Sequence, residues 1–386
     1  MPVILEKIPE NRVKPPRPIT RHWCIFGVGA LVVGMGLTFL FWQGERSGIG
    51  FWFFAVVLPV LLWGTLFSAR RAGYKYQRVG QDAANRTIKS RYENDKSRGQ
   101  RFAWFTSEYL VNALERQHIA TQTAAVANLP ILQPVIPRGG GKPVRHSRLS
   151  DQGSASDVLG LYEYQVVEHV NLLLEALPDS MTCYLALDLA KDLPDISNNW
   201  LLRITRPLIR IRELSGLQIL DYWLDYHYAK PAALLVISAQ LNNVPADDSG
   251  EAISVILITN CRIENTPSKS ARIHRPQINH TGDMNHALCH AMLWAGLGKD
   301  AVLRGWISGG TLASSDTLST ACSIYAPELI AQCYVNIDSV AGFAGVAAPW
   351  QALILATRQC IAQGEAQLVV TETSPDYRQV CVVTPG

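Results

Sequence analysis

Two long apolar stretches near the N-terminus constrain the fold of this chain more than any other feature. Trp23–Trp42 and Ile49–Ala69 are runs of 20 and 21 residues without a single Asp, Glu, Lys or Arg. A bilayer core of about 30 Å is crossed by about 20 helical residues, so each stretch is long enough to span a membrane. Aromatic residues lie at both ends of each stretch, as is typical of membrane interfaces. The sequence therefore predicts a hairpin of two transmembrane helices.

Two other interpretations of these stretches are weaker. A secretory signal peptide is disfavoured, because 20 apolar residues are long for its core and Gln43–Arg46 offers no small-x-small cleavage pattern. Two buried core helices are disfavoured by the short connection and by the aromatic and basic flanks. Ala30 and Gly34 form a small-xxx-small pair that would let the two helices pack closely, and Pro59 is expected to kink the second helix.

The distribution of basic residues predicts how the hairpin is oriented. Five Lys or Arg residues precede the first stretch, and ten lie between Arg70 and Arg101 beside only three acidic residues. The connection between the stretches has only Glu45 and Arg46. Positively charged flanks remain on the cytoplasmic side, so both termini and the rest of the chain are expected there.

Composition excludes two classes of protein for the remaining chain. The net charge is only +3 and no basic surface with interleaved aromatic residues follows the hairpin, so a nucleic-acid partner is not expected. The eight cysteines are scattered without CxxC spacing, which is typical of reduced, buried thiols rather than a disulfide framework.

The pattern beyond the hairpin predicts an α/β fold. We expect five segments: a Pro-rich basic tail (1–22), the hairpin (23–69), a basic segment with a helix and a linker (70–155), and two α/β domains (156–265 and 266–386). Apolar runs rich in Val and Ile, bounded by Pro, Asn and Asp, predict strands that are covered on both faces. The expected strands are 181–187, 232–239, 252–259 and 302–307, with a closing hairpin of 366–371 and 377–384. The expected helices are 104–121, 157–177, 283–295 and 349–363.

Histidines give the sharpest local signal for chemistry. His274, His280, His286 and His290 fall within 17 residues. His286 and His290 are four residues apart on one expected helix, a spacing that lets two imidazoles share a metal. The residues between them include no Glu to act as a base, and surface histidines explain the pattern equally well. We therefore expect no metal and no cofactor, with His286 and His290 as the only weak candidates.

A candidate nucleophile lies in Thr320-Ala321-Cys322-Ser323. A cysteine that enters a helix can be activated at the helix N-terminus. This motif resembles the active-site motif of the β-ketoacyl synthases, and the stretch 336–347 resembles their Asn-x-Gly-His-Thr region. The resemblance implies a thiolase-like fold for the C-terminal half. No histidine follows Cys322, however, and Asp338-Ser339 stands where the family has Gly-His. We therefore expect no catalytic residue, with Cys322 as a weak candidate.

An aromatic cluster is the candidate for binding another protein. Tyr222, Trp223, Tyr226 and Tyr228 lie close together with Asp221, Asp225 and His227. Aromatic side chains bury a large area with few rotatable bonds, so they are enriched in cores and in protein interfaces. We interpret this cluster as a partner-binding surface.

The order of segments as a whole is similar to that of the type VI lipase adapter family of Gram-negative bacteria. The shared features are the N-terminal membrane segment, an α/β domain, a junction such as Ala271–Pro276 and a thiolase-like C-terminal half. The resemblance implies a non-enzymatic adapter at the bacterial inner membrane. Its partners would be a phospholipase effector and a spike protein of the secretion apparatus, and its hairpin would contact membrane lipids. The alternative is a membrane-bound acyl-transfer enzyme that uses Cys322 with His286 or His290 as the base.

Overall fold

A computed structural model gives the fold of most of the chain. It describes residues 3–44, 46, 48–193, 200–211, 214–263, 270–279, 283–299, 301–312, 316–329, 334–374 and 377–386. The contacts divide the chain into two compact units, Ile4–Lys96 and a larger one that contains Ser97–Gly386. Each unit is described by itself. The predicted boundaries at 155/156 and 265/266 remain predictions, and His280 lies outside the described residues.

The smaller unit contains two helices that are long and apolar enough to cross a membrane. The first is α1 (Thr20–Phe41); the second is continuous through α2 (Ile49–Trp52), a π-helical segment η2 (Phe53–Val57) and α3 (Leu58–Gly99). The predicted pair of apolar helices is confirmed. The second helix continues for thirty residues beyond Ala69, because the polar stretch that follows contains no proline to stop it. A short 3-10 turn, η1 (Leu5–Lys7), precedes α1.

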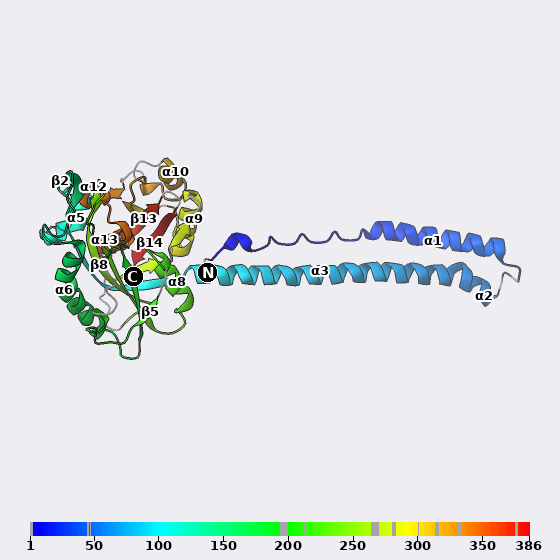
Figure 1. The fold of residues 1–386 in the computed structure, drawn as a ribbon. Helices are drawn as coiled ribbons and strands as arrows, with labels where there is room; N and C mark the ends of the chain where they lie inside the picture. The colour runs from blue at the N-terminus through cyan, green and yellow to red at the C-terminus, as the bar shows by residue number, and fades with distance from the viewer. Residues whose placement is uncertain are drawn as a thin grey trace. The chain divides into compact units, whose positions relative to one another are not determined.

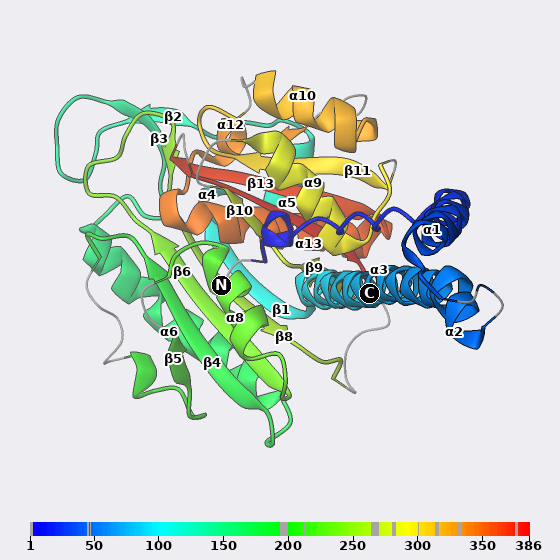
Figure 2. The same cartoon turned by 90° about the vertical axis from the view of Figure 1, so that its right-hand side faces the viewer.

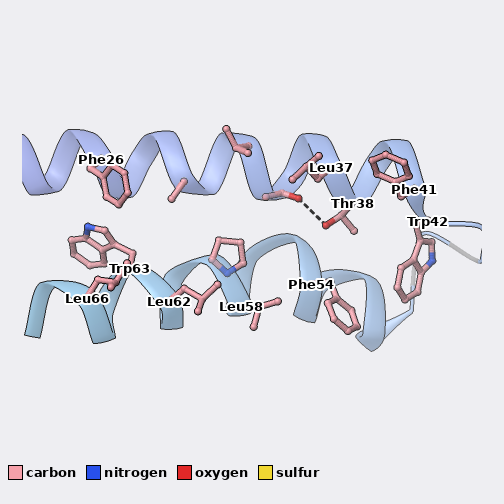
Figure 3. Close-up of a pocket in the computed structure, with 14 residues that line it drawn as sticks. Phe26, Leu37, Thr38, Phe41, Trp42, Phe54, Leu58, Leu62, Trp63 and Leu66 are labelled. Carbon is pink, nitrogen blue, oxygen red and sulfur yellow. Dashed lines mark hydrogen bonds between the residues drawn. The ribbon is translucent and has the colours of Figure 1, made fainter. Parts of the chain in front are cut away.

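The two apolar helices touch at a small residue. A Cβ atom added to Gly34 would lie 2.3 Å from Cγ of Pro59, so only glycine allows this approach. Pro59 has no N–H to donate to the carbonyl four residues back, and the π-helical turn η2 ends two residues before it. The Trp63 indole donates a hydrogen bond to the Trp23 carbonyl at 2.7 Å and joins the helices a second time. Figure 3 shows the two helices side by side from Phe26 and Trp63 to Trp42.

The larger unit is built on one mixed sheet whose strands follow the order β12-β11-β13-β14-β9-β1-β8-β6-β4-β5, with β10 paired to β14. Their bounds are β1 Phe102–Asn112, β4 Thr182–Leu189, β5 Ile209–Ile211, β6 Ala232–Gln240, β8 Ala252–Thr259, β9 Ala271–His274, β10 Gln277–Asn279, β11 Val302–Ser308, β12 Val335–Asn336, β13 Ala366–Ser374 and β14 Tyr377–Pro385. A separate small sheet joins β2 (Gln133–Val135), β3 (Val144–Ser147) and β7 (Ser249–Gly250). Figure 1 shows these strands with helices on both sides.

The large sheet consists of two halves with the same topology. From the centre outward the first half runs β1-β8-β6-β4-β5 and the second runs β9-β14-β13-β11-β12, which is the same sequence-order pattern. In both halves the two inner pairings are antiparallel and the two outer pairings are parallel. The halves meet where β1 pairs with β9. The larger unit is therefore an internal structural repeat.

Helices cover both faces of each half. The bounds of the layer helices are α6 Ala155–Glu175, α8 Gln218–Tyr226, α9 Met284–Ala295, α10 Asp316–Tyr325 and α13 Ala348–Gln363; the short helices are α4 Ala113–Arg116, α5 Thr121–Val126, α12 Asp338–Ala341 and the 3-10 turn η3 Gly345–Ala347. One buried cluster joins α8 and α13 to the inner faces of both halves. A second cluster packs α6 on the outer face of the first half, and a third packs α9 and α10 on the outer face of the second. Figure 2 lets the reader follow these layers.

The apolar runs of the sequence follow from this layering. In β6, Leu234 and Val236 face the central helices, while Leu235 and Ile237 face α6. Successive strand residues point to opposite faces, so a strand that is covered twice is apolar throughout. The predicted strands and the helices from 157, 283 and 349 are confirmed within a few residues. Ser154 and Asp157 form a capping box that fixes the start of α6.

Two expectations are wrong. The first concerns the helix expected over 104–121: residues 104–112 belong instead to the strand β1, which is central because it pairs with both β8 and β9, and the short helix α4, Ala113–Arg116, follows it. The sequence of β1 is rich in aromatic residues, which favour strands, and their apparent helical spacing misled the prediction. The second concerns the expected helix 157–177, whose apolar spacing predicts that Leu161 belongs to its buried stripe; Leu161 is instead 65% exposed.

Candidate functional site

The central helices α8 and α13 begin at a cluster of buried polar side chains, and this cluster links the two halves of the sheet. The Asp188 carboxylate, at the end of β4, accepts hydrogen bonds from the Gly216 amide at 2.7 Å and from the Trp350 indole of α13 at 2.8 Å. The next amide, that of Leu217, donates to the side-chain oxygen of Gln379 on β14 at 2.8 Å. The free N–H groups before α8 are therefore satisfied by side chains from both halves.

Burial sets the electrostatics of this group. Burial raises the pKa of Asp188 to about 6, although the hydrogen bonds from Trp350 and Gly216 oppose the shift. Burial also raises the pKa of the nearby Tyr377 hydroxyl to about 12. Asp188, Trp350 and Gln379 are less than 5% exposed, so this start of α8 is packed with side chains. Sequence reasoning missed this group; its one signal was a lone acid near the end of an apolar strand.

Cys322 does not have the setting of an activated nucleophile. It lies in the second turn of α10, on the outer layer of the second half, and its side chain is fully buried. Burial raises the pKa of its thiol, and only an interaction with the Tyr334 hydroxyl acts the other way. A thiolate is the reactive form of cysteine, and burial in apolar surroundings disfavours it. The expectation that Cys322 lies at a helix N-terminus is wrong.

The structure separates the described histidines of the cluster: His286 and His290 lie on α9, whereas His274 lies on β9. His286 and His290 lie on successive turns of α9 with ring centroids 4.2 Å apart, as their spacing predicts. His274 is buried on β9, where its Nε2 lies 2.9 Å from the Thr384 hydroxyl, and burial lowers its pKa to about 4. A protein zinc site takes three or four protein ligands, and α9 supplies two imidazoles. The expectation of no metal stays a prediction.

The aromatic cluster separates into a buried and an exposed part. Trp223 is fully buried in the central layer, so it belongs to the core and not to a binding surface. Tyr222 and Tyr226 are 37% and 57% exposed, and their rings lie 4.6 Å apart on successive turns of α8. Tyr228 is half-buried beneath the Arg101 guanidinium, 5.0 Å from its ring.

The neighbours of the exposed tyrosines extend the aromatic area. Tyr184 of β4 stacks on His227 with ring centroids 4.0 Å apart, and His227 lies 5.9 Å from Tyr222. Burial lowers the pKa of His227, which favours its neutral form. We call Tyr184, Tyr222, Tyr226 and His227 the aromatic surface.

An ion-pair network holds the adjacent side of α8. Asp225 accepts two hydrogen bonds from Arg98, at 2.8 and 2.9 Å, and one from Arg275 at 2.8 Å. Asp221, one turn earlier, accepts from Arg275 at 2.6 Å. Burial opposes ionisation of Asp225, but its hydrogen bonds with Arg98 and Arg275 outweigh that effect and hold its pKa below the ordinary range. The network fixes the orientation of the helix that carries the aromatic surface.

Comparison with known proteins identifies the fold. A scan against protein-family models and a search of curated proteins each give no match. Among solved structures, the keto synthase–chain length factor PfaC matches with a TM-score of 0.53 and 10% identity, over 74% of this chain and 43% of that chain. An acyltransferase, ChlB3, and the ishigamide ketosynthase/chain length factor each give a TM-score of 0.48, with 12% and 13% identity, over 73% of this chain and 97% and 99% of theirs.

The larger unit has a thiolase-like α/β fold, as the likeness to PfaC shows. The predicted fold class is therefore confirmed. The likeness covers about three-quarters of the chain, so it extends well beyond the C-terminal half for which it was expected. At this level of identity it shows the fold alone.

Proposed function

We propose that the protein is a membrane-anchored, non-catalytic adapter whose thiolase-like unit binds another protein. The observation that carries the proposal is the aromatic surface on α8. Two exposed tyrosines with neighbouring rings lie on a helix that is held by a buried ion-pair network, and they form a rigid, amphipathic contact area. Rigid aromatic side chains lose little entropy on binding and dominate the energetics of protein interfaces.

The absence of catalysis is supported by the chemistry of the candidate groups. Cys322 is buried with a raised pKa on an outer layer. The start of α8 is filled by Asp188, Gln379 and Trp350, none of which is a thiol or an imidazole. The competing function, acyl transfer by Cys322, is favoured by the acyl-transfer enzymes among the structural neighbours. It requires a reactive Cys322 thiol, and labelling of that thiol is the direct test.

We further propose a location and a partner. The apolar helices would anchor the protein in the inner membrane of a Gram-negative bacterium, with both termini in the cytoplasm, since basic residues flank the hairpin on both sides. The partner would be a lipase-type effector that is loaded on the spike of a type VI secretion apparatus. This finer proposal rests on the order of segments and on the thiolase-like fold that the adapter resemblance implied.

The test is affinity purification of the tagged, detergent-solubilised full chain from its native cell, with mass spectrometry of the proteins that accompany it. We expect a lipase-like toxin or a spike protein, and we expect the Tyr222→Ala/Tyr226→Ala double variant to lose at least tenfold of it. The matched control is Tyr164→Ala, which removes a tyrosine that is 61% exposed on α6. Equal recovery with the double variant would overturn the role of the aromatic surface, and recovery of no such partner would overturn the adapter function.

A further inference from the structure

An apolar groove of about 610 Å³ runs between the two helices of the hairpin. Its walls are formed by α1 on one side and by the first turns of α3 on the other, and Figure 3 shows the lining side chains between them. The groove is within the size range of sites that bind small molecules. From Phe26 to Phe41, at 1.5 Å per residue, it extends for about 22 Å. This exceeds one leaflet of the hydrocarbon core, which is about 15 Å thick.

Three features keep the groove open and apolar. Gly34 contacts Pro59 at the bottom of the groove. The helices therefore meet there through small groups, and no side chain fills the groove beside this contact. The Thr38 hydroxyl, the main polar side-chain group of the lining, already donates to the Gly34 carbonyl at 2.7 Å. Trp63, hydrogen-bonded to the Trp23 carbonyl, fixes one end. The groove therefore suits a hydrocarbon chain rather than a polar ligand.

The end of the groove at Phe26 and Leu66 leads to basic side chains. Arg70 follows Leu66 by four residues and Trp63 by seven, so it lies on the groove face of α3 one turn further along. His22 precedes Phe26 by four residues and occupies the matching place on α1. In the described part of the chain Arg70 is exposed and makes no ion pair, and the two apolar stretches contain no acid. An apolar channel that ends at the unpaired Arg70 guanidinium and at the His22 imidazole is complementary to an anionic amphiphile.

We propose that this groove binds one acyl chain of an anionic phospholipid, with the lipid phosphate at Arg70 and His22. The inference rests on the membrane anchorage that is part of the proposed function. An arginine at a membrane surface contributes about fivefold to the binding of an anionic lipid, and a bidentate contact with phosphate adds orientation. The Arg70 guanidinium gives selectivity for the anionic headgroup, while the groove gives retention of the acyl chain.

The experiment measures lipids retained by the full chain. The protein is purified in a mild detergent, mixed with equal amounts of dioleoyl phosphatidylglycerol and dioleoyl phosphatidylcholine, and analysed by native mass spectrometry. We expect one retained phosphatidylglycerol, favoured at least fivefold over phosphatidylcholine. Arg70→Gln should reduce this preference about fivefold, whereas Lys75→Gln, the same charge change five residues along α3, should leave it within twofold.

A second pair of variants tests the groove itself. Ala30→Leu fills the lining and should reduce retention of both lipids at least fivefold. Gly29→Leu adds a similar side chain at a neighbouring position where a Cβ meets nothing within 4 Å, and it should retain lipid normally. Circular dichroism of each variant checks that the helices still form, and Arg70→Gln lies outside the apolar stretch, so it tests the proposal even if Ala30→Leu misfolds.

Three results would overturn the inference. One is equal retention of the two lipids by the native protein, and another is equal loss with Arg70→Gln and Lys75→Gln, which would indicate general surface charge. The third is a lipid-free dimer, in which a second copy fills the groove. Carbonate extraction of native membranes separates these failures from failure of the anchorage: a chain released by carbonate would overturn the proposed function as well.

Discussion

At the scale of single residues, the state of Cys322 decides between the two functions. Its side chain is fully buried and burial raises the pKa of its thiol, so we expect N-ethylmaleimide to label it only after unfolding. Mass spectrometry of the labelled peptides measures this, with the partly exposed Cys289 of the adjacent α9 as the internal control. Labelling of Cys322 faster than Cys289 in the folded protein would favour the acyl-transfer enzyme. Cys322→Ala should leave partner recovery unchanged.

Asp188 predicts a specific dependence of stability on pH. Its pKa is about 6 in the folded chain and 3.8 when exposed, so the folded state binds the proton more tightly than the unfolded state. The stabilisation by this group is therefore complete below pH 4 and is lost as the pH rises through 6, which amounts to about 3 kcal/mol. Asp188→Asn keeps an acceptor oxygen and does not titrate.

The measurement compares unfolding of the native chain and Asp188→Asn in urea at pH 4, 5, 6 and 7. Relative to the variant, the native chain should lose about 2 kcal/mol of unfolding free energy across this range. A difference that does not change with pH would mean that Asp188 titrates normally. Asp338, whose pKa burial also raises to about 6, should show the same trend when replaced by Asn.

At the scale of elements, the ion-pair network predicts how α8 is held. Asp225→Ala leaves the buried Arg275 and the adjoining Arg98 without their shared partner, and loss of one member of a buried pair costs about 3 kcal/mol or more. Thermal unfolding of the solubilised chain measures this. Asp82→Ala is the control, because its pair with Arg78 is exposed and 3.8 Å long, so it should change stability by less than about 0.5 kcal/mol. Equal effects would show that the network carries no special stability.

Helices and strands were predictable from the sequence where the pattern of apolar residues within one segment determines its structure. The apolar runs at 232–239 and 252–259 gave their strands almost to the residue, because a strand covered on both faces needs apolar residues at every position. The strand β1 was not recognisable, since its place between β8 and β9 is set by pairing with residues at least 140 positions away. The same holds for Gln379, which reaches the start of α8 only through the fold.

At the scale of the whole molecule, the two halves of the internal repeat depend on each other for a complete core. The first half has α6 on its outer face and the second has α9 and α10. Each half contributes one helix, α8 or α13, to the shared central layer, so neither half covers its inner face alone. No repeat is visible in the residues, because the topology requires only apolar strands and helices in the same order. The partner-binding and catalytic residues of such a fold are therefore not fixed by its topology, and function has to be argued from sites such as the aromatic surface.

Membrane topology provides the last prediction, since it places the thiolase-like unit on one side of the bilayer. The basic flanks predict that the connection between the helices faces outward and that the segment after Arg70 faces the cytoplasm. A cysteine introduced by Gln43→Cys should therefore react with a membrane-impermeant maleimide in intact spheroplasts. Its matched control, Gln77→Cys, is an exposed residue of α3 beyond the apolar stretch and should react only after lysis. The reverse pattern would put the aromatic surface outside the cytoplasm, where it could not receive a cytoplasmic effector.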